Sequence, residues 1–200
     1  MHWRGPLAYR SVSCWGAVSV LCRQRCHAID DLGLAWIEEP IVYDNLEGYV
    51  RLTADLRTPV QIGENFYGPR ALHTALQMKA CDYVMPDFMQ IGGVTGWQRA
   101  AAFAAAAGIP ISTHLYPEVA AHVMRVSETA HWLEWQDWAN PILQQPYQVR
   151  NGKLHNPDVA GVGLEWDEKA VAAHLADDFW TNPLLKDWRV SPSPTRKSRE

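Results

Sequence analysis

Residues 82–114 decide the fold, and they read DYVMPDFMQIGGVTGWQRAAAFAAAAGIPISTH. An apolar run over 82–85 is broken by Pro86, which predicts a strand and its end. An alanine-rich stretch over 95–107, stopped by a glycine, predicts a helix. A second apolar run over 109–113 predicts the next strand. A strand, a helix and a second strand of these lengths make one β/α unit of a parallel sheet.

The same unit repeats on both sides of this stretch. Upstream, the predicted elements are strands at 34–38 and 60–62 and helices at 46–56 and 69–78. Downstream, they are a helix at 118–126, a strand at 131–135, a hairpin-like loop over 140–157 and a final helix over 167–175. Repeated β/α units predict an α/β fold, a partial (β/α) TIM-like barrel.

Ionisable residues recur where the predicted strands end. They are Glu38, Glu64, Asp87, His114 and Glu134, at successive steps of 26, 23, 27 and 20 residues. The carboxyl ends of barrel strands share one rim, so we expect the five side chains to converge there. Two glutamates, an aspartate, a histidine and a third glutamate on one rim predict a site for metal binding and proton transfer.

Glu38 and Glu64 are the candidate metal ligands, because carboxylate oxygens suit a hard divalent cation such as Mg²⁺. The alternative for a single glutamate at a strand end is a solvated rim residue. Asp87 and His114 form a candidate base, since a carboxylate that accepts from one imidazole nitrogen makes the other more basic. Glu134 could donate a hydrogen bond to a substrate carboxylate if burial keeps it protonated. The other histidines are expected to be structural or on the surface.

The overall composition excludes several classes of protein. The net charge is −4, and Lys and Arg cluster only at 195–198, so we expect no nucleic-acid partner. No stretch reaches the roughly 18 to 20 apolar residues of a membrane span, so no membrane partner and a cytoplasmic location are expected. A signal peptide over 11–22 is disfavoured because no small-residue cleavage site follows. The four cysteines have neither zinc-site spacing nor the setting of a disulfide framework.

Several motifs together resemble a known family. The segments WIEEP, PVQIGEN, MPDFMQIGGVTGW, GIPISTHLYPE and TAHWLEW are similar to the C-terminal barrel half of the enolase superfamily, in particular mandelate racemase and its relatives. The likeness runs from about residue 31 to about residue 175. It divides the chain into an unmatched segment 1–29, a partial barrel domain 30–180 and an extended or disordered tail 181–200.

This resemblance implies a modified (β/α)₇β barrel that removes the proton α to a carboxylate with the help of Mg²⁺. It places the second and third metal ligands at Glu38 and Glu64, the His–Asp dyad at His114 and Asp87, and the hydrogen-bond donor at Glu134. The implied partner is a small carboxylic acid, and the implied activity is a racemase of 2-hydroxy acids or a dehydratase of sugar acids. Intact members of the family are often homo-oligomers.

The chain also departs from the family pattern. The family's first metal-ligand Asp should lie near Val12, but no acid occurs before Asp30, and the first lysine is Lys79, so the Lys-x-Lys bases are missing. The N-terminal capping domain is missing as well. We therefore expect a truncated chain whose residues 1–29 are an altered reading of that region or a gene-model artefact. Asp30 and Asp31 are the acids that could replace the lost ligand.

Two functions remain open at this stage. One is a Mg²⁺-dependent racemase or dehydratase in which dehydration survives better than racemisation, because racemisation needs a base on each face of the carbon. The other is a catalytically inactive fragment that lacks one metal ligand, the lysine bases and the cap, with two open sheet edges.

Overall fold

The computed structural model describes residues 19–174. The predicted tail 181–200, most of segment 1–29 and Cys14 lie outside these residues. The helices are α1 (Ser19–Ile29), α2 (Leu46–Asp55), α3 (Pro69–Met78), α4 (Gly93–Ala107), α5 (Pro117–Met124), the 3₁₀ turn η1 (Asn140–Ile142) and α6 (Glu168–Ala173). The strands are β1 (Ile37–Glu38), β2 (Val60–Ile62), β3 (Tyr83–Val84), β4 (Gln148–Arg150) and β5 (Lys153–His155).

The chain forms two compact units. Among the described residues, the first comprises 19–138 and 147–163, and the second comprises 139–146 and 164–174. The first unit holds the β/α repeats and the β4–β5 hairpin. In the second, Leu143 pairs with Trp166 in an antiparallel bridge beside α6. Asp167 caps α6 by accepting hydrogen bonds from the amides of Lys169 and Ala170.

A parallel sheet forms the centre of the first unit. Its strands lie in the order β1, β2, β3, with Glu38 opposite Gln61 and Ile62 opposite Val84. Single parallel bridges extend this order from Val84 to Ile111 and from Ile111 to Ala130. Five consecutive parallel segments with helices between them confirm the predicted partial barrel.

The sheet is strongly curled. The rings of Trp36 and His131, which belong to its first and fifth segments, have centroids 6.2 Å apart. The Tyr83 ring lies 4.8 Å from the same imidazole. In a flat sheet the first and fifth segments would be separated by roughly 19 Å, four times the usual strand spacing. The three rings therefore meet on the concave side, where partial burial lowers the pKa of His131, although this residue is still exposed to solvent.

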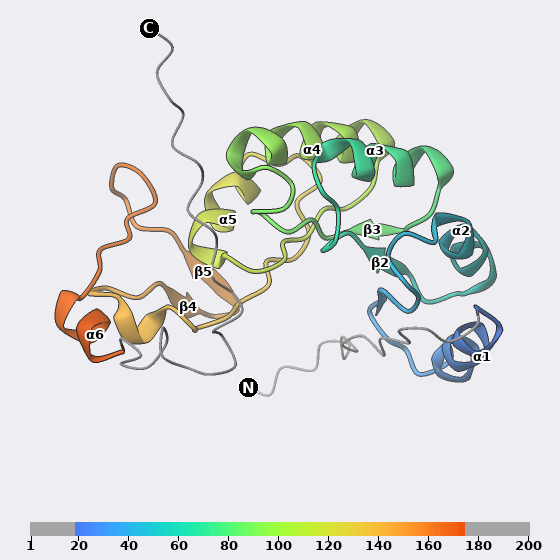
Figure 1. Ribbon diagram of the computed structural model, residues 1–200, viewed down its shortest axis with the longest axis horizontal. Helices are drawn as coiled ribbons and strands as arrows, with labels where there is room; N and C mark the ends of the chain where they lie inside the picture. Colours follow the sequence, from blue (N-terminus) through green and yellow to red (C-terminus); the bar gives the residue numbers. More distant parts are fainter. Residues whose placement is uncertain (1–18, 175–200) are drawn as a thin grey trace, which may run out of the picture. The chain divides into compact units, whose positions relative to one another are not determined.

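Helices pack on the opposite side of the strands, where the apolar core lies. Figure 1 shows α3 and α4 side by side along the strands. Alanines on α4, such as Ala100 and Ala104, are fully buried and allow the two helices to approach closely. Trp97 is also buried and donates a hydrogen bond from its indole to Ser127, at 3.0 Å. The core thus joins three consecutive β/α units.

Two predicted strands are less regular than expected. The segment 109–113 contains one residue in isolated bridges, Ile111, and the bridge of the fifth segment lies at Ala130, just before the predicted range 131–135. Pro110 lacks an N–H and cannot donate to a ladder, although its carbonyl accepts from Val84. The pairing nevertheless continues, since Thr113 donates to Trp132 and His131 donates to Ile111, each at 2.9 Å. Both segments therefore stay in line with the sheet without forming long strands.

Helix α1 belongs to the same core, although its sequence lies in segment 1–29, which the family motifs did not match. Cys22 and Cys26 are buried among the core residues, and Cys81 is buried in the same core. Burial raises the pKa of Cys81 to about 12. No helix in the described part of the chain combines the length and apolar character needed to cross a bilayer.

Candidate active site

The carboxyl ends of the parallel segments carry all five predicted site residues. They are Glu38 at the end of β1, Glu64 just beyond β2, Asp87 just beyond β3, His114 after the fourth segment and Glu134 after the fifth. A parallel bridge places Asp87 opposite His114. The His114 imidazole lies within ion-pair distance of both Asp87 and Glu64.

Asp87 and His114 form a closely coupled pair. The distance from His114 Nδ1 to Asp87 Oδ2 is 2.9 Å. The other oxygen, Oδ1, accepts from the backbone amides of Met89 at 2.8 Å and Gln90 at 2.9 Å, and Asp87 is only 3% exposed. An anionic carboxylate held in this way favours the imidazole tautomer with the proton on Nδ1. In that tautomer the lone pair of His114 that can accept a proton is on Nε2.

Glu64 lies on the other side of the imidazole. Its Oε2 atom is 3.5 Å from His114 Nε2. Its Oε1 atom accepts a hydrogen bond from the side-chain amide of Asn65, at 3.3 Å. The Glu64 side chain is 36% exposed and that of His114 is 19% exposed, so both can be reached from solvent.

Glu39 supports this arrangement, and our sequence reasoning missed it. Its carboxylate accepts from the amide of Gly63 at 3.0 Å and from the side chain of Asn65 at 2.8 Å. Its backbone has a φ of 37°, which a residue with a side chain rarely adopts. Burial raises the pKa of Glu39; hydrogen bonds from Gly63 and Asn65 oppose this effect, and the charge of Glu64 adds to it. The two consecutive glutamates before Pro40 are the sequence feature that could have pointed to a role for Glu39.

Glu38 is held inside the curled sheet. Its Oε2 atom accepts from the indole of Trp36 and from the side-chain amide of Gln61, both at 3.3 Å. Burial raises the pKa of Glu38 and the charge of Glu134 adds to this effect, whereas the two hydrogen bonds and His114 lower it. Gln61 is fully buried, and a polar residue in the centre of a buried strand could have indicated this contact.

Glu134 reaches the rim from the fifth segment. Its Oε2 atom accepts from the amide of Leu115 at 2.9 Å, and its own amide donates to Thr113 Oγ1 at 3.0 Å. Leu115 and the following Tyr116 have φ values of 53° and 49°. Two consecutive left-handed residues are costly, and such strain often accompanies functional loops. The strained turn directs the Leu115 amide at the Glu134 carboxylate.

The donor chemistry on this rim fits a hard cation. Glu38 and Glu64 supply carboxylate oxygens, the ligand type that Mg²⁺ prefers. The side-chain oxygen of Gln61, next to Glu38, is buried and accepts no hydrogen bond. Among the described residues, however, no group of three His, Cys, Asp or Glu side chains is arranged to hold a metal ion. A cation here would rely on two carboxylates, with water and substrate as further ligands.

Asp30 does not replace the missing ligand. Its carboxylate accepts from the amides of Arg57, at 3.1 Å, and Thr58, at 2.7 Å. These residues precede β2, whereas Glu64 follows it. Asp31 is also turned toward Arg57, with which it forms an ion pair. Both aspartates therefore lie toward the amino ends of the strands, away from the rim.

A family model for "Enolase C-terminal domain-like" proteins matches residues 14–170 of this chain. The chain belongs to this family. The resemblance to the enolase superfamily and its mandelate racemase group is thereby confirmed. The match includes α1 and begins inside segment 1–29, further upstream than the sequence motifs reached.

Solved structures of the family are similar to this chain in fold and sequence. An enolase from the alpha proteobacterium BAL199 with bound Mg is 65% identical, with a TM-score of 0.78, over 80% of this chain and 44% of that chain. An enolase from Bradyrhizobium complexed with magnesium and mandelic acid is 42% identical, with a TM-score of 0.74, over 78% of this chain and 43% of that chain.

A curated relative is the L-talarate/galactarate dehydratase of Salmonella typhimurium. It is 30% identical over 142 residues, which are 71% of this chain and 36% of the relative. The chain therefore spans less than half the length of the relatives that it matches.

Proposed function

We propose that this protein removes the proton α to the carboxylate of a 2-hydroxy or sugar acid, in a Mg²⁺-dependent dehydratase or racemase reaction. The observation that carries the proposal is the coupled Asp87–His114 pair, whose second imidazole nitrogen faces Glu64. Magnesium in the related structures supports the choice of cation. The mandelic acid complex and the sugar-acid dehydratase support the choice of substrate class.

Each residue on the rim has a role in this proposal. His114 takes the α-proton on Nε2, and Asp87 holds the imidazole in the tautomer that permits it. Glu38 and Glu64 would hold Mg²⁺, which when bound supplies a positive charge beside the substrate carboxylate. Glu134 would donate a hydrogen bond to the same carboxylate if it takes up a proton when the negatively charged substrate binds. The electron pair of the broken C–H bond moves onto that carboxylate.

Dehydration fits the described residues better than racemisation. After the α-proton has moved to His114, the same imidazolium can protonate a β-hydroxyl group, which leaves as water. Racemisation instead needs a second base on the opposite face of the carbon. Among the described residues, the contacts on the rim provide one imidazole and no lysine. We therefore assign the proposed reaction to the dehydratase class first.

The second candidate is a chain that keeps the fold without catalysis. It is favoured by the lack of a three-residue metal group among the described residues. In this alternative, the approach of Glu64 to His114 is a structural ion pair that holds the rim together. The two candidates predict different outcomes in a single experiment.

That experiment is incubation of mandelate enantiomers and galactarate in D₂O with Mg²⁺. Exchange of the α-proton and release of a dehydrated product are followed by ¹H NMR, and interconversion is followed by chiral chromatography. The proposal expects exchange or dehydration that requires Mg²⁺ and is lost in His114→Asn, with His122→Asn as the matched control. Inert wild-type protein that is folded by circular dichroism would support the non-catalytic alternative. Activity that survives in His114→Asn would exclude His114 as the base.

A further inference from the structure

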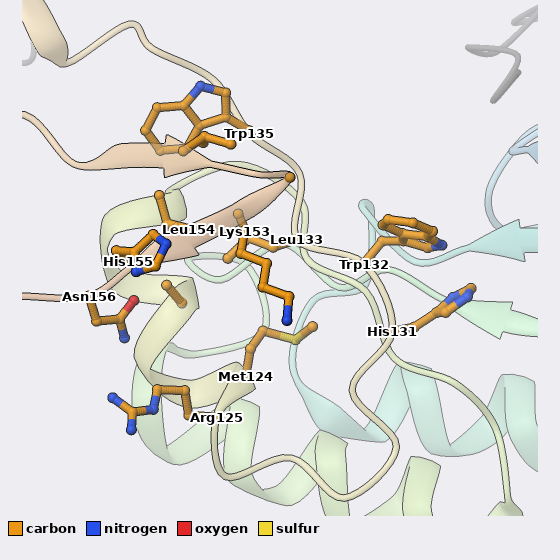
Figure 2. Close-up of a pocket in the computed structure, with 13 residues that line it drawn as sticks. Met124, Arg125, His131, Trp132, Leu133, Trp135, Lys153, Leu154, His155 and Asn156 are labelled. Atoms are coloured by element: carbon orange, nitrogen blue, oxygen red, sulfur yellow. The ribbon is translucent and has the colours of Figure 1, made fainter. Parts of the chain in front are cut away.

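A cavity in the first compact unit is lined by none of the five rim residues. Its volume is about 620 Å³, and its walls come from the end of α5, the segment 131–135 and the β4–β5 hairpin (Figure 2). These elements all belong to the first compact unit. The volume is within the range of roughly 300 to 1,000 Å³ that is typical of small-molecule sites.

The ionisable side chains that the described residues place around this cavity are all basic. Arg125 lies at the end of α5, Lys153 and His155 lie on β5, and His131 lies in the segment 131–135. No Asp or Glu is among the described residues that line the cavity. Within the part of the chain that the structure describes, neither Arg125 nor Lys153 forms an ion pair. Two cations beside one cavity without a carboxylate leave a positive potential that favours an anion.

The polar groups lie close to an apolar wall. Figure 2 shows Lys153 extending from the hairpin toward Met124 on α5. The side-chain nitrogen of Asn156, which also lines the cavity, is buried and has no hydrogen-bond acceptor. Leu133 and Trp135 contribute apolar surface to the same cavity. Hydrogen-bond donors and apolar groups around one cavity match a ligand with an anionic head and an apolar body.

None of the five rim residues lines the cavity, although the segment 131–135 contributes to both and the cavity residue His131 packs near Trp36. The carboxylate of Glu134 turns to the Leu115 amide on the rim, while its neighbours Leu133 and Trp135 line the cavity. None of the residues proposed to act on the α-proton lines this space. The inference below therefore does not depend on the proposed function.

We propose that this cavity binds a small organic anion, a carboxylate or a phosphate monoester, that carries an apolar or aromatic body. Arg125 and Lys153 pair with the anionic oxygens, and the side chain of Asn156 provides a further donor. Leu133 and Trp135 contact the apolar body. Binding requires both the negative charge of the ligand's head group and its apolar or aromatic body.

Calorimetric titration of the full chain in the presence of EDTA tests this site, because chelation removes any metal-dependent binding at the rim. The probes are phenyl phosphate and benzoate, compared with inorganic phosphate and with neutral benzyl alcohol. We expect both aromatic anions to bind, and both to bind more tightly than inorganic phosphate and benzyl alcohol. Preference for phenyl phosphate or for benzoate would decide between a phosphate and a carboxylate head.

Charge-neutralising variants locate the site. Lys153→Gln and Arg125→Gln should each weaken binding of the aromatic anion about fivefold, as expected for the loss of one partly exposed ion pair. Arg99→Gln, which removes an exposed cation from α4, should change the affinity less than twofold. The proposal is overturned if no aromatic anion binds, if benzyl alcohol binds as well as benzoate, or if the three variants behave alike. Circular dichroism checks that each variant remains folded.

Discussion

The carboxylate of Glu39 accepts a hydrogen bond from the side-chain amide of Asn65 at 2.8 Å, and the same amide donates to Glu64 at 3.3 Å. One amide therefore links a half-buried glutamate to a proposed metal ligand. Such outer contacts orient a ligand before the ion arrives. The pair explains how Glu64, which lies beyond the end of β2, can hold a defined position near His114.

Replacing Asn65 should therefore weaken the binding of a divalent cation. In Asn65→Ala, Glu64 loses its hydrogen-bond donor while the charge of the rim stays the same. We expect the affinity for Mn²⁺, used as a paramagnetic substitute for Mg²⁺, to fall about tenfold. Electron paramagnetic resonance of free Mn²⁺ measures this change. Gln98→Ala removes an exposed amide from α4 and should leave the affinity unchanged; an equal loss in both variants would contradict the positioning role.

The wild-type chain should itself bind Mg²⁺ weakly. Two carboxylates are available on the described rim, and affinity for hard cations depends on the number of charged ligands. We expect isothermal titration to give a dissociation constant at least about tenfold higher than that of the 65% identical relative measured in parallel. Equal affinities would mean that another oxygen completes the site, and Gln61→Leu would then test the unpaired amide oxygen beside Glu38.

Asp87 should stabilise the folded chain and determine which imidazole nitrogen of His114 carries the proton. Asp87→Ala removes the acceptor for two backbone amides and for His114, and we expect a loss of about 2 to 4 kcal/mol in the free energy of unfolding. Asp87→Asn keeps an oxygen for the two amides, so it should cost less. Its amide nitrogen would face Nδ1, however, and should shift the proton of His114 to Nε2. Urea denaturation and ¹⁵N NMR of the imidazole measure the two effects separately.

The sequence predicted the fold well where apolar runs end at Gly or Pro. The strand at 60–62 and the helix at 69–78 have the bounds that the structure gives to β2 and α3. The apolar pattern was less informative around Pro110. It predicts a full strand there, but Pro110 has no N–H to donate, and the segment forms only single bridges. The pattern also could not assign α1 to the core, since the packing of Cys22 and Cys26 depends on distant residues.

The position of the rim could be predicted from the sequence, but most of the hydrogen bonds made by its side chains could not. Spacing alone placed five ionisable residues at the ends of parallel segments, and the structure brings them to one rim. The roles assigned to them remain predictions. The links made by Glu39, Gln61 and Asn65 depend on backbone geometry such as the φ of 37° at Glu39, which no residue pattern specifies.

Gly96 should tolerate no side chain. A Cβ atom at this position would lie 2.0 Å from the backbone oxygen of Ile91, so the turn that begins α4 would have to move. We expect Gly96→Ala to lower the free energy of unfolding by about 3 kcal/mol or more. Gly108→Ala is the control: its φ of +67° is unfavourable for alanine, but no atom lies within 4 Å, so a cost of about 1 kcal/mol is expected. Similar midpoints in urea would contradict the predicted clash.

Asp30 should make the stability of the chain depend on pH. Burial alone would raise the pKa of Asp30, but hydrogen bonds from Arg57 and Thr58 lower it overall. Because the folded pKa is below the unfolded value of about 3.9, Asp30 stabilises the fold above that pH and loses this effect as the pH falls through its folded pKa. Asp30→Asn should therefore cost about 1 to 2 kcal/mol at pH 7 and less at pH 3. Urea denaturation at both pH values measures the difference, and the exposed Asp158→Asn should show none. A cost for Asp30→Asn that is the same at both pH values would mean that the amide contacts stabilise the fold without favouring the charged carboxylate.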